Sequence, residues 1–181
     1  MRLCAGSTPR SPGCRLRHNE GMARHACTDP QHHVHDGDAF VHEVERVCES
    51  RGLRLTPIRA HALRLIADAG RPIKAYELLD RMKTTHDAAA PPTVYRALDF
   101  LLEHGFIHKL ASINAFVGCH HPGGAQHAVP FLICDRCQSA VELEDERIVA
   151  MLDARARELG FTPSAQTLEV HGMCADCARQ T

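Results

Sequence analysis

Two cysteine pairs constrain this chain more than any other feature of its sequence. Each pair has the form Cys-x-x-Cys, first at Cys134 and Cys137 and again at Cys174 and Cys177. Two such pairs are the usual ligands of a tetrahedral Cys4 zinc site, and a single redox-active pair is the alternative. The spacing between the pairs exceeds that of a compact zinc ribbon, but a strand-helix-strand pattern between them can bring them together. Four thiolates leave no open coordination position, so the sequence predicts a structural zinc ion.

Composition narrows the class of protein further. The chain has 181 residues, a formal net charge of −1, nine cysteines and fourteen histidines. This length predicts one or two small domains, and the odd number of cysteines favours metal binding over a disulfide framework. No run of about 18 apolar residues occurs, so we expect no membrane span. The Arg-rich N-terminus lacks the apolar stretch of a secretory signal, which predicts a cytoplasmic protein.

The first half of the chain has the pattern of a winged helix-turn-helix. Apolar residues at helical spacing predict four helices, over residues 38–51, 56–69, 75–83 and 92–104. Thr56 and Pro57 are typical of a helix start, and Gly52 is typical of a residue that follows a helix end. The segments FIHKL and NAFVGC then predict two short strands around the turn ASI. The third helix, the loop after it and the fourth helix would form a DNA-reading unit.

The second half predicts a separate small domain. After the Gly- and His-rich segment HHPGGAQH, the segments VPFLIC and SAVELE, a helix over about 146–159 and the segment TLEVHG give the order β-β-α-β. Residues 51–110 carry ten Lys and Arg against six Asp and Glu, whereas residues 111–181 carry five against nine. The first half is therefore the candidate for DNA binding. The predicted fold class is α+β, with a disordered His-rich extension over 1–36, a winged-helix domain over 37–119, a hinge linker over 120–128 and an α/β domain over 129–181.

The fourth predicted helix carries polar residues away from its apolar stripe. Thr93, Tyr95 and Arg96 lie near its start, outside the stripe formed by apolar residues such as Val94 and Leu98. Hydroxyl groups and a guanidinium group suit contacts to phosphates and base edges, and the amides at a helix start add to phosphate binding. The alternative is a solvated face of an ordinary amphipathic helix.

A second possible metal site is much less evident from spacing. Two histidines, one cysteine and one carboxylate flank the boundary between the two halves, at His108, Cys119, His127 and Glu142. A lone histidine such as His108 is by default a solvated or core residue. Spacing alone does not distinguish these four from the other histidines and acids of the chain.

Several segments resemble the ferric uptake regulator family, and more narrowly its zinc-sensing branch. They are LTPIRAHALRLI, KAYELLD, PPTVYRALDFLLEHGFIHK, NAFVGC and FLICDRCQSAVELE, and the similarity covers about residues 38–178. The resemblance implies a dimeric repressor with an N-terminal winged helix, a C-terminal dimerisation domain and a regulatory metal at the hinge.

The resemblance also implies roles for individual residues. Tyr95 and Arg96 match a DNA-contacting pair, and Tyr76 matches another tyrosine near DNA. Cys134, Cys137, Cys174 and Cys177 match the structural zinc ligands. The regulatory zinc ligands match His108, Cys119, His127 and Glu142, which gives two zinc ions per protomer. Because His120 and His121 adjoin Cys119, either of them is an alternative sensing ligand.

The expected function is zinc-dependent repression. The zinc-bound homodimer would bind a palindromic operator and control zinc uptake genes, with no small-molecule substrate besides zinc. A sensor of iron, manganese or peroxide is the nearest alternative. However, the HHDH-type run that the iron and peroxide branches carry before the Cys-x-x-Cys is missing, and a thiolate favours zinc. A zinc-dependent hydrolase is a third reading, yet four protein ligands leave no position for water and no HExxH motif occurs.

Residues 1–21 are expected to be dispensable, because they offer no apolar surface to a core. Met22 is a second candidate start codon besides Met1. A chain that begins at Met22 should bind zinc and DNA as the full chain does, and parallel titrations of both chains measure this. Loss of either activity would assign residues 1–21 a role. Metal storage by the histidines of the whole extension is a separate alternative, which deletion of the extension tests.

Overall fold

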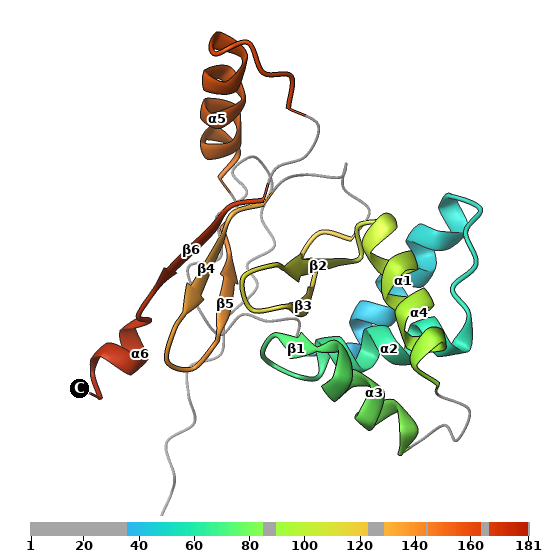
Figure 1. Cartoon of the computed structure of the whole chain (residues 1–181). Coiled ribbons are helices and arrows are strands. Elements are labelled where there is room, and N and C mark those ends of the chain that lie inside the picture. Colours follow the sequence, from blue (N-terminus) through green and yellow to red (C-terminus); the bar gives the residue numbers. More distant parts are fainter. Residues whose placement is uncertain (1–35, 85–89, 123–128, 144, 164–166, 181) are drawn as a thin grey trace, which may run out of the picture.

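A computed structural model describes residues 36–84, 90–122, 129–143, 145–163 and 167–180 of the chain. The predicted extension, apart from Asp36, and the predicted ligand His127 lie outside these ranges. Figure 1 shows a helical unit with a small sheet beside a second sheet with two helices, and the predicted α+β class is confirmed. In chain order the first unit contains α1 Gly37–Ser50, α2 Pro57–Ala67, β1 Ile73–Lys74, α3 Ala75–Lys83, α4 Pro91–Glu103, β2 Ile107–Leu110 and β3 Ala115–Gly118. The second contains β4 Phe131–Cys134, β5 Ala140–Glu142, α5 Glu146–Glu158, β6 Glu169–Gly172 and α6 Ala175–Ala178.

The helix ends follow from local sequence signals. The Asp36 carboxylate accepts hydrogen bonds from the amides of Asp38 and Ala39, which caps the start of α1. Gly52, with φ of 65°, follows the end of α1 as expected, and Leu53 N donates to Cys48 O across the turn. Gly105, with φ of 70°, makes the same kind of turn after α4 and leads the chain into β2.

The core of the first unit lies between its four helices. α2 packs against α1, α3 and α4, and its Leu63 is fully buried. The buried face of α4 includes Ala97 and Phe100 besides the predicted Val94 and Leu98, whereas Leu102 is only partly buried. The Arg59 guanidinium carbon lies 3.6 Å from the centre of the Phe100 ring and covers it. Both α3 and α4 therefore pack against α2 and contact each other.

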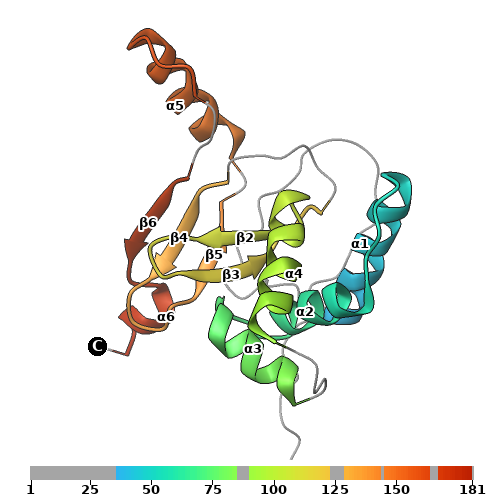
Figure 2. The ribbon, with the colours of Figure 1, turned by 45° about the vertical axis from the view of Figure 1, so that its right-hand side comes forward.

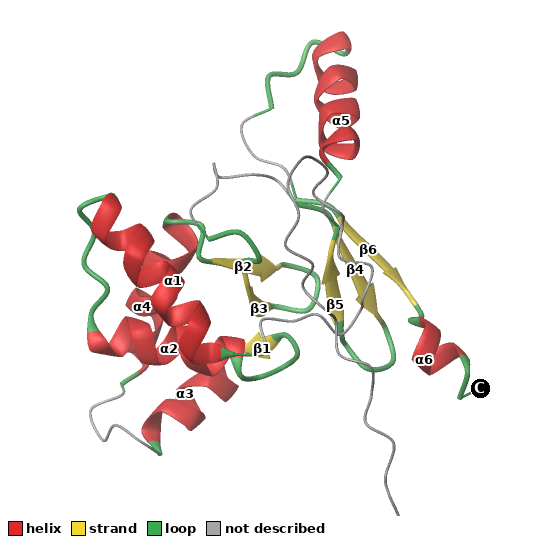
Figure 3. Cartoon of the chain, turned by 180° about the vertical axis from the view of Figure 1, so that it is seen from behind, coloured by secondary structure: helices red, strands yellow, loops and turns green. Residues whose placement is uncertain are grey.

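The first sheet has the order β1-β3-β2 with antiparallel pairing. β1 was not predicted, because two residues are too short to show a period. Residues 107–118, which form β2, its turn and β3, are called the wing below. Leu110 at the end of β2 is buried against Phe131, Ile133 and Ala140 of the second sheet. The wing therefore stands between the helices and the second sheet, as Figures 1 and 3 show.

The second sheet has the order β5-β4-β6, in which β4 pairs antiparallel with β5 and parallel with β6. Phe131 of β4 lies opposite Glu142 of β5 and opposite Glu169 of β6. Residues in register share a face, so these three side chains form one row across the face that meets the wing. Leu132 and Val170 lie opposite each other on the other face, and both are exposed.

α5 extends away from the rest of the chain (Figures 1 and 2). None of its residues is buried, and apolar side chains of α5 and of the segment after it are exposed: Met151, Leu152, Leu159 and Phe161. Leu132 and Val170 on the outer face of the second sheet are exposed as well, so the second unit has several uncovered apolar side chains. None of the helices in the described ranges has the length and apolar character needed to cross a membrane.

Candidate functional site

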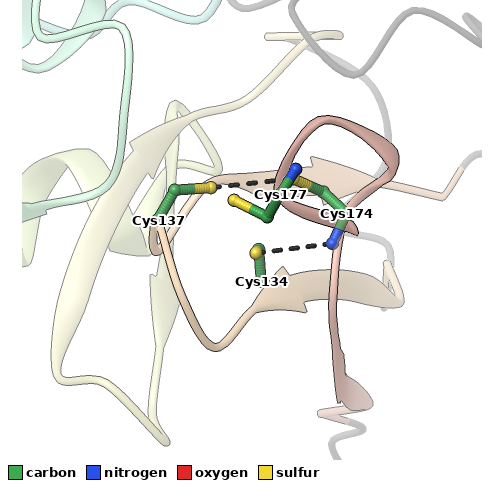
Figure 4. Close-up of side chains that lie close together, drawn as sticks. All are labelled: Cys134, Cys137, Cys174 and Cys177. Carbon is green, nitrogen blue, oxygen red and sulfur yellow. Dashed lines mark hydrogen bonds between the residues drawn. The ribbon is translucent and has the colours of Figure 1, made fainter. Parts of the chain in front are cut away.

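The four cysteines of the two pairs meet at one end of the second sheet (Figure 4). Cys134 ends β4, and Cys174 caps the start of α6. Because Cys134 lies opposite Gly172 in the parallel pairing, the residues just after both strands are brought together. All four sulfur atoms lie within 4.8 Å of one another, and the Cys137 and Cys174 Sγ atoms are 3.8 Å apart. A tetrahedron with Zn–S bonds of about 2.3 Å has edges of about 3.8 Å, so the cluster fits zinc.

The thiols of this cluster differ in acidity. Amide hydrogen bonds, first from Cys137 and then from Cys174, lower the pKa of Cys134 to about 6. Hydrogen bonding to the Ser139 hydroxyl and amide also lowers the pKa of Cys137. The Cys177 thiol donates to Cys174 and is buried, and both effects raise its pKa to about 12. A bound zinc ion would supply the positive charge that lets all four ionise, since zinc binds thiolates.

A second cluster lies where the wing meets the second sheet. His108 comes from β2, Cys119 directly follows β3, and Glu142 ends β5. One ligand atom from each lies within 4.8 Å of the others, and His108 Nε2 is 3.9 Å from Glu142 Oε2. Zinc bonds of about 2.0–2.1 Å to nitrogen and oxygen need a separation of about 3.4 Å, so a contraction of about 0.5 Å would suffice.

Burial distinguishes this cluster from ordinary surface groups. Cys119 is 1% exposed and Glu142 is 6% exposed. Among the described residues, Glu142 is the one carboxylate that is buried. A carboxylate is rarely buried unless it is paired or binds a metal. The His120 amide donates to Glu142 Oε2 over 3.4 Å, which places His120 beside the cluster. Three of the four predicted sensing residues thus converge, and the fourth, His127, lies outside the described residues.

The polar residues predicted to meet DNA lie on α3 and α4, which Figure 2 shows side by side. Tyr76 near the start of α3 is 60% exposed, and Tyr95 on α4 is 55% exposed. Arg96 is exposed as well, and Thr93 is partly buried. Exposed aromatic rings next to an exposed arginine are unusual for a plain solvated face. The surface therefore suits contact with a partner.

The prediction that amides at the start of α4 add to phosphate binding is wrong. The start of α4 does not present free amides to a phosphate, because its first two residues, Pro91 and Pro92, have no N–H group. The next two amides, of Thr93 and Val94, both donate to the carbonyl oxygen of Ala90. Phosphate contacts at this helix would have to come from side chains.

Comparison with known proteins identifies the family. The model of the ferric uptake regulator family matches residues 50–171. The chain belongs to this family. Members of the ferric uptake regulator family are transcriptional regulators.

Within the family, relatives that are at least 40% identical to this chain include regulators of zinc uptake. The chain is 42% identical to the zinc uptake regulation protein of Escherichia coli strain K12 over 135 residues, which are 75% of this chain and 79% of the relative. A crystal structure of holo XcZur is 70% identical with a TM-score of 0.74, over 78% of this chain and 98% of that chain. A zinc uptake regulator complexed with zinc and DNA is 40% identical with a TM-score of 0.77, over 80% and 96%.

Sequence reasoning missed two polar residues at the contact between the wing and the second sheet. Glu169 and His171 lie on β6, on the face that meets the wing. The alternation of TLEVHG places Glu169 and His171 on one face and Val170 on the other, which is a usable signal. The sequence does not reveal that β6 pairs in parallel with β4, and this pairing decides which part of the molecule that face of β6 contacts.

Proposed function

We propose that this member of the ferric uptake regulator family is a zinc-responsive transcriptional repressor. In this proposal the zinc-bound homodimer binds a palindromic operator in the cytoplasm and controls zinc uptake genes. The similarity to zinc uptake regulators, one of them complexed with zinc and DNA, supports it. The single observation that carries it is the convergence of His108, Cys119 and Glu142 at the contact between the two units.

Two zinc ions per protomer are proposed, with different tasks. Cys134, Cys137, Cys174 and Cys177 would hold a structural ion in a closed tetrahedron. His108, Cys119, Glu142 and His127 would hold the regulatory ion, and one thiolate, two imidazoles and one carboxylate are a suitable set for zinc. Since these residues come from the wing, the linker and the second sheet, zinc there would tie the two units together. In this proposal residues 37–119 form the DNA-binding domain, residues 120–128 the hinge and residues 129–181 the dimerisation domain.

The exposed apolar surface of the second unit supports a homodimer. Leu132 and Val170 on the outer face of the sheet and Met151, Leu159 and Phe161 on or near α5 are uncovered in a single chain. An exposed apolar surface of this kind is typical of an interface, and a second copy is the partner that the family implies. Two copies would place two α4 helices at a fixed separation, as a palindromic operator requires.

Zinc would act by fixing that separation. Without regulatory zinc, the two DNA-binding units would sample many orientations, and only some of them would reach both half-sites. With zinc bound, the orientation that fits the operator would be favoured. The coupling is reciprocal, so operator DNA would raise zinc affinity by the same factor, typically about 5–150-fold.

Replacing Arg96 with alanine tests the proposed DNA contact. If Arg96 is bidentate to a guanine, specific binding should weaken by about 1–3 kcal/mol, with relaxed preference at one base step in each half-site. A lost phosphate contact would instead weaken all sequences alike and lower the salt slope by about one. Titrations on matched and mismatched operators at several salt concentrations distinguish the two.

Arg147→Ala is the matched control for that variant. It removes the same charge from an exposed residue of the second unit, where Arg147 pairs with Asp145. Affinity should stay unchanged in this control. Unchanged affinity in Arg96→Ala as well would remove Arg96 from the interface.

A mobility shift on a palindromic operator across buffered free zinc tests the function as a whole. Retardation that rises with free zinc and shows the size of a dimer is expected. Iron and manganese in place of zinc test the alternative sensors in the same assay. Retardation that is independent of zinc, or that responds better to iron or manganese, would contradict the proposal.

A further inference from the structure

The wing turn is held on the second sheet by contacts that need no metal. Glu169 of β6 accepts hydrogen bonds from two successive amides of that turn, from Ala111 N to Oε1 over 2.6 Å and from Ser112 N to Oε2 over 2.9 Å. His171 lies two residues further along the same face, with its Nε2 2.9 Å from Ser112 Oγ. Its Nδ1 is 2.9 Å from Asp135 Oδ1, which orients the ring. These contacts join β6 to the wing turn, although the two segments lie far apart in the sequence.

The charge state of Glu169 agrees with this arrangement. Burial raises the pKa of its carboxyl group, but hydrogen bonds from Ser112 and Ala111 and the nearby His171 outweigh burial and hold the pKa below its ordinary value. The group is therefore ionised at neutral pH. Hydrogen bonds to an ionised acceptor are stronger than those between neutral groups.

A hydrolytic role for these side chains conflicts with the same geometry. Ser112, His171 and Asp135 follow the hydrogen-bonding order of a serine hydrolase triad. Such a site needs free amides to bind a developing oxyanion. Here the two nearest amides already donate to Glu169, whose negative charge would repel an oxyanion. The cluster is suited to holding the turn.

Glu169 and the candidate regulatory site contact the wing at two different points. Glu142 and Glu169 flank Phe131 in one row of the sheet, on opposite edges. Two strand spacings separate them, or about 10 Å. Glu142 meets His108 near the start of the wing, and Glu169 meets the turn at its tip. A hairpin attached at one point can pivot, whereas attachment at two points fixes its direction.

We propose that Glu169 and His171 form a latch on the wing turn that works together with the regulatory zinc to fix the orientation of the DNA-binding unit. This inference rests on the proposed function for its regulatory consequence, although the latch itself does not require zinc. It makes Glu169 and His171 positioning residues, because they act through the wing turn and belong to neither of the two candidate metal clusters. The strength of the latch would then set how far bound zinc tightens operator binding.

Glu169→Gln in the full chain is the decisive variant. The side chain keeps its size, but its amide group would face one of the two N–H donors. In the zinc-bound protein, amide hydrogen exchange at Ala111 and Ser112 should be about tenfold faster than in the unsubstituted protein. The zinc-dependent gain in operator affinity should fall about fivefold, with unchanged zinc content and unchanged dimerisation. Ser112→Ala removes the hydroxyl that contacts His171 and Glu169 but keeps both amide donors, so it should give a smaller loss in the same direction.

Glu158→Gln is the matched control, because it removes the same charge from an exposed residue of α5 that pairs with Arg155. It should leave exchange in the wing turn unchanged. Unchanged exchange at Ala111 and Ser112 in Glu169→Gln would overturn the latch. Faster exchange with a full zinc response would overturn its regulatory role. If the unsubstituted protein shows no zinc-dependent operator binding, the proposed function fails, and the exchange rates still decide whether the latch exists.

Discussion

Cys134→Ser is expected to lose the Cys4 zinc ion, the order of the second sheet and the dimer. The buried apolar cluster at this sheet is small and consists of Phe131, Ile133 and Ala140 with Leu110 from the wing. A core of that size supplies little stability by itself. Structural zinc contributes about 10–16 kcal/mol in zinc-finger peptides at neutral pH, which equals or exceeds the total stability of a typical domain. The metal is therefore expected to be a folding requirement.

Zinc content, sedimentation and far-ultraviolet circular dichroism of this variant measure the three losses. Cys48→Ser is the matched control, because Cys48 is equally buried but lies in α1, away from both clusters. That control should keep its zinc and its dimer. A Cys134→Ser protein that stays folded and dimeric with unchanged metal content would refute the structural assignment.

Cys119→Ser is expected to uncouple operator binding from zinc without unfolding the protein. Cys119 follows β3, and its amide donates to Phe106 O, a contact that serine retains. Cys119 supplies the sulfur of the His108, Cys119 and Glu142 cluster, and a soft ligand favours zinc over harder divalent ions. Without it, the gain in operator affinity on zinc binding, about 5–150-fold, should disappear. The Cys4 zinc ion and the dimer should remain.

Metal stoichiometry, dimerisation and operator affinity across buffered zinc test this variant beside the unsubstituted protein. Cys48→Ser again controls for the loss of a buried thiol and should respond to zinc normally. Full zinc activation of Cys119→Ser would exclude Cys119 as the switch. His120, whose amide contacts Glu142, would then be the next residue to replace, followed by His121.

The helices could be predicted from the sequence because their signals are local. The third helix begins and ends at Ala75 and Lys83 as predicted, and the fourth begins at Pro91, one residue before the expected start. β1 was missed, since Ile73 and Lys74 form a strand only through pairing with β3. The prediction that the start of α4 presents free amides was wrong, because the amides of Thr93 and Val94 already donate to the carbonyl oxygen of Ala90.

The two metal clusters differ in how far the sequence reveals them. The spacing of Cys134 and Cys137 and of Cys174 and Cys177 identifies one candidate site without any further knowledge. His108 and Glu142 lie on two strands and Cys119 follows a third, and the selection of these residues depended on the family resemblance. The contacts of Glu169 depend on strand register and on the docking of two units, for which a single sequence carries no signal.

The pairing of β4 with β6 has a consequence for the order of events during synthesis. Phe131 pairs with Glu169, which is made 38 residues later, and β6 follows the end of the wing by about 50 residues. At about 5–20 residues per second, the helical unit has about 3–10 s to fold before β6 leaves the site of synthesis. A nascent chain would thus possess a folded DNA-reading surface before it possesses the strand that carries Glu169 and leads to Cys174. Newly made molecules would therefore complete the Cys4 cluster and the contacts of Glu169 only when their last strand is in place.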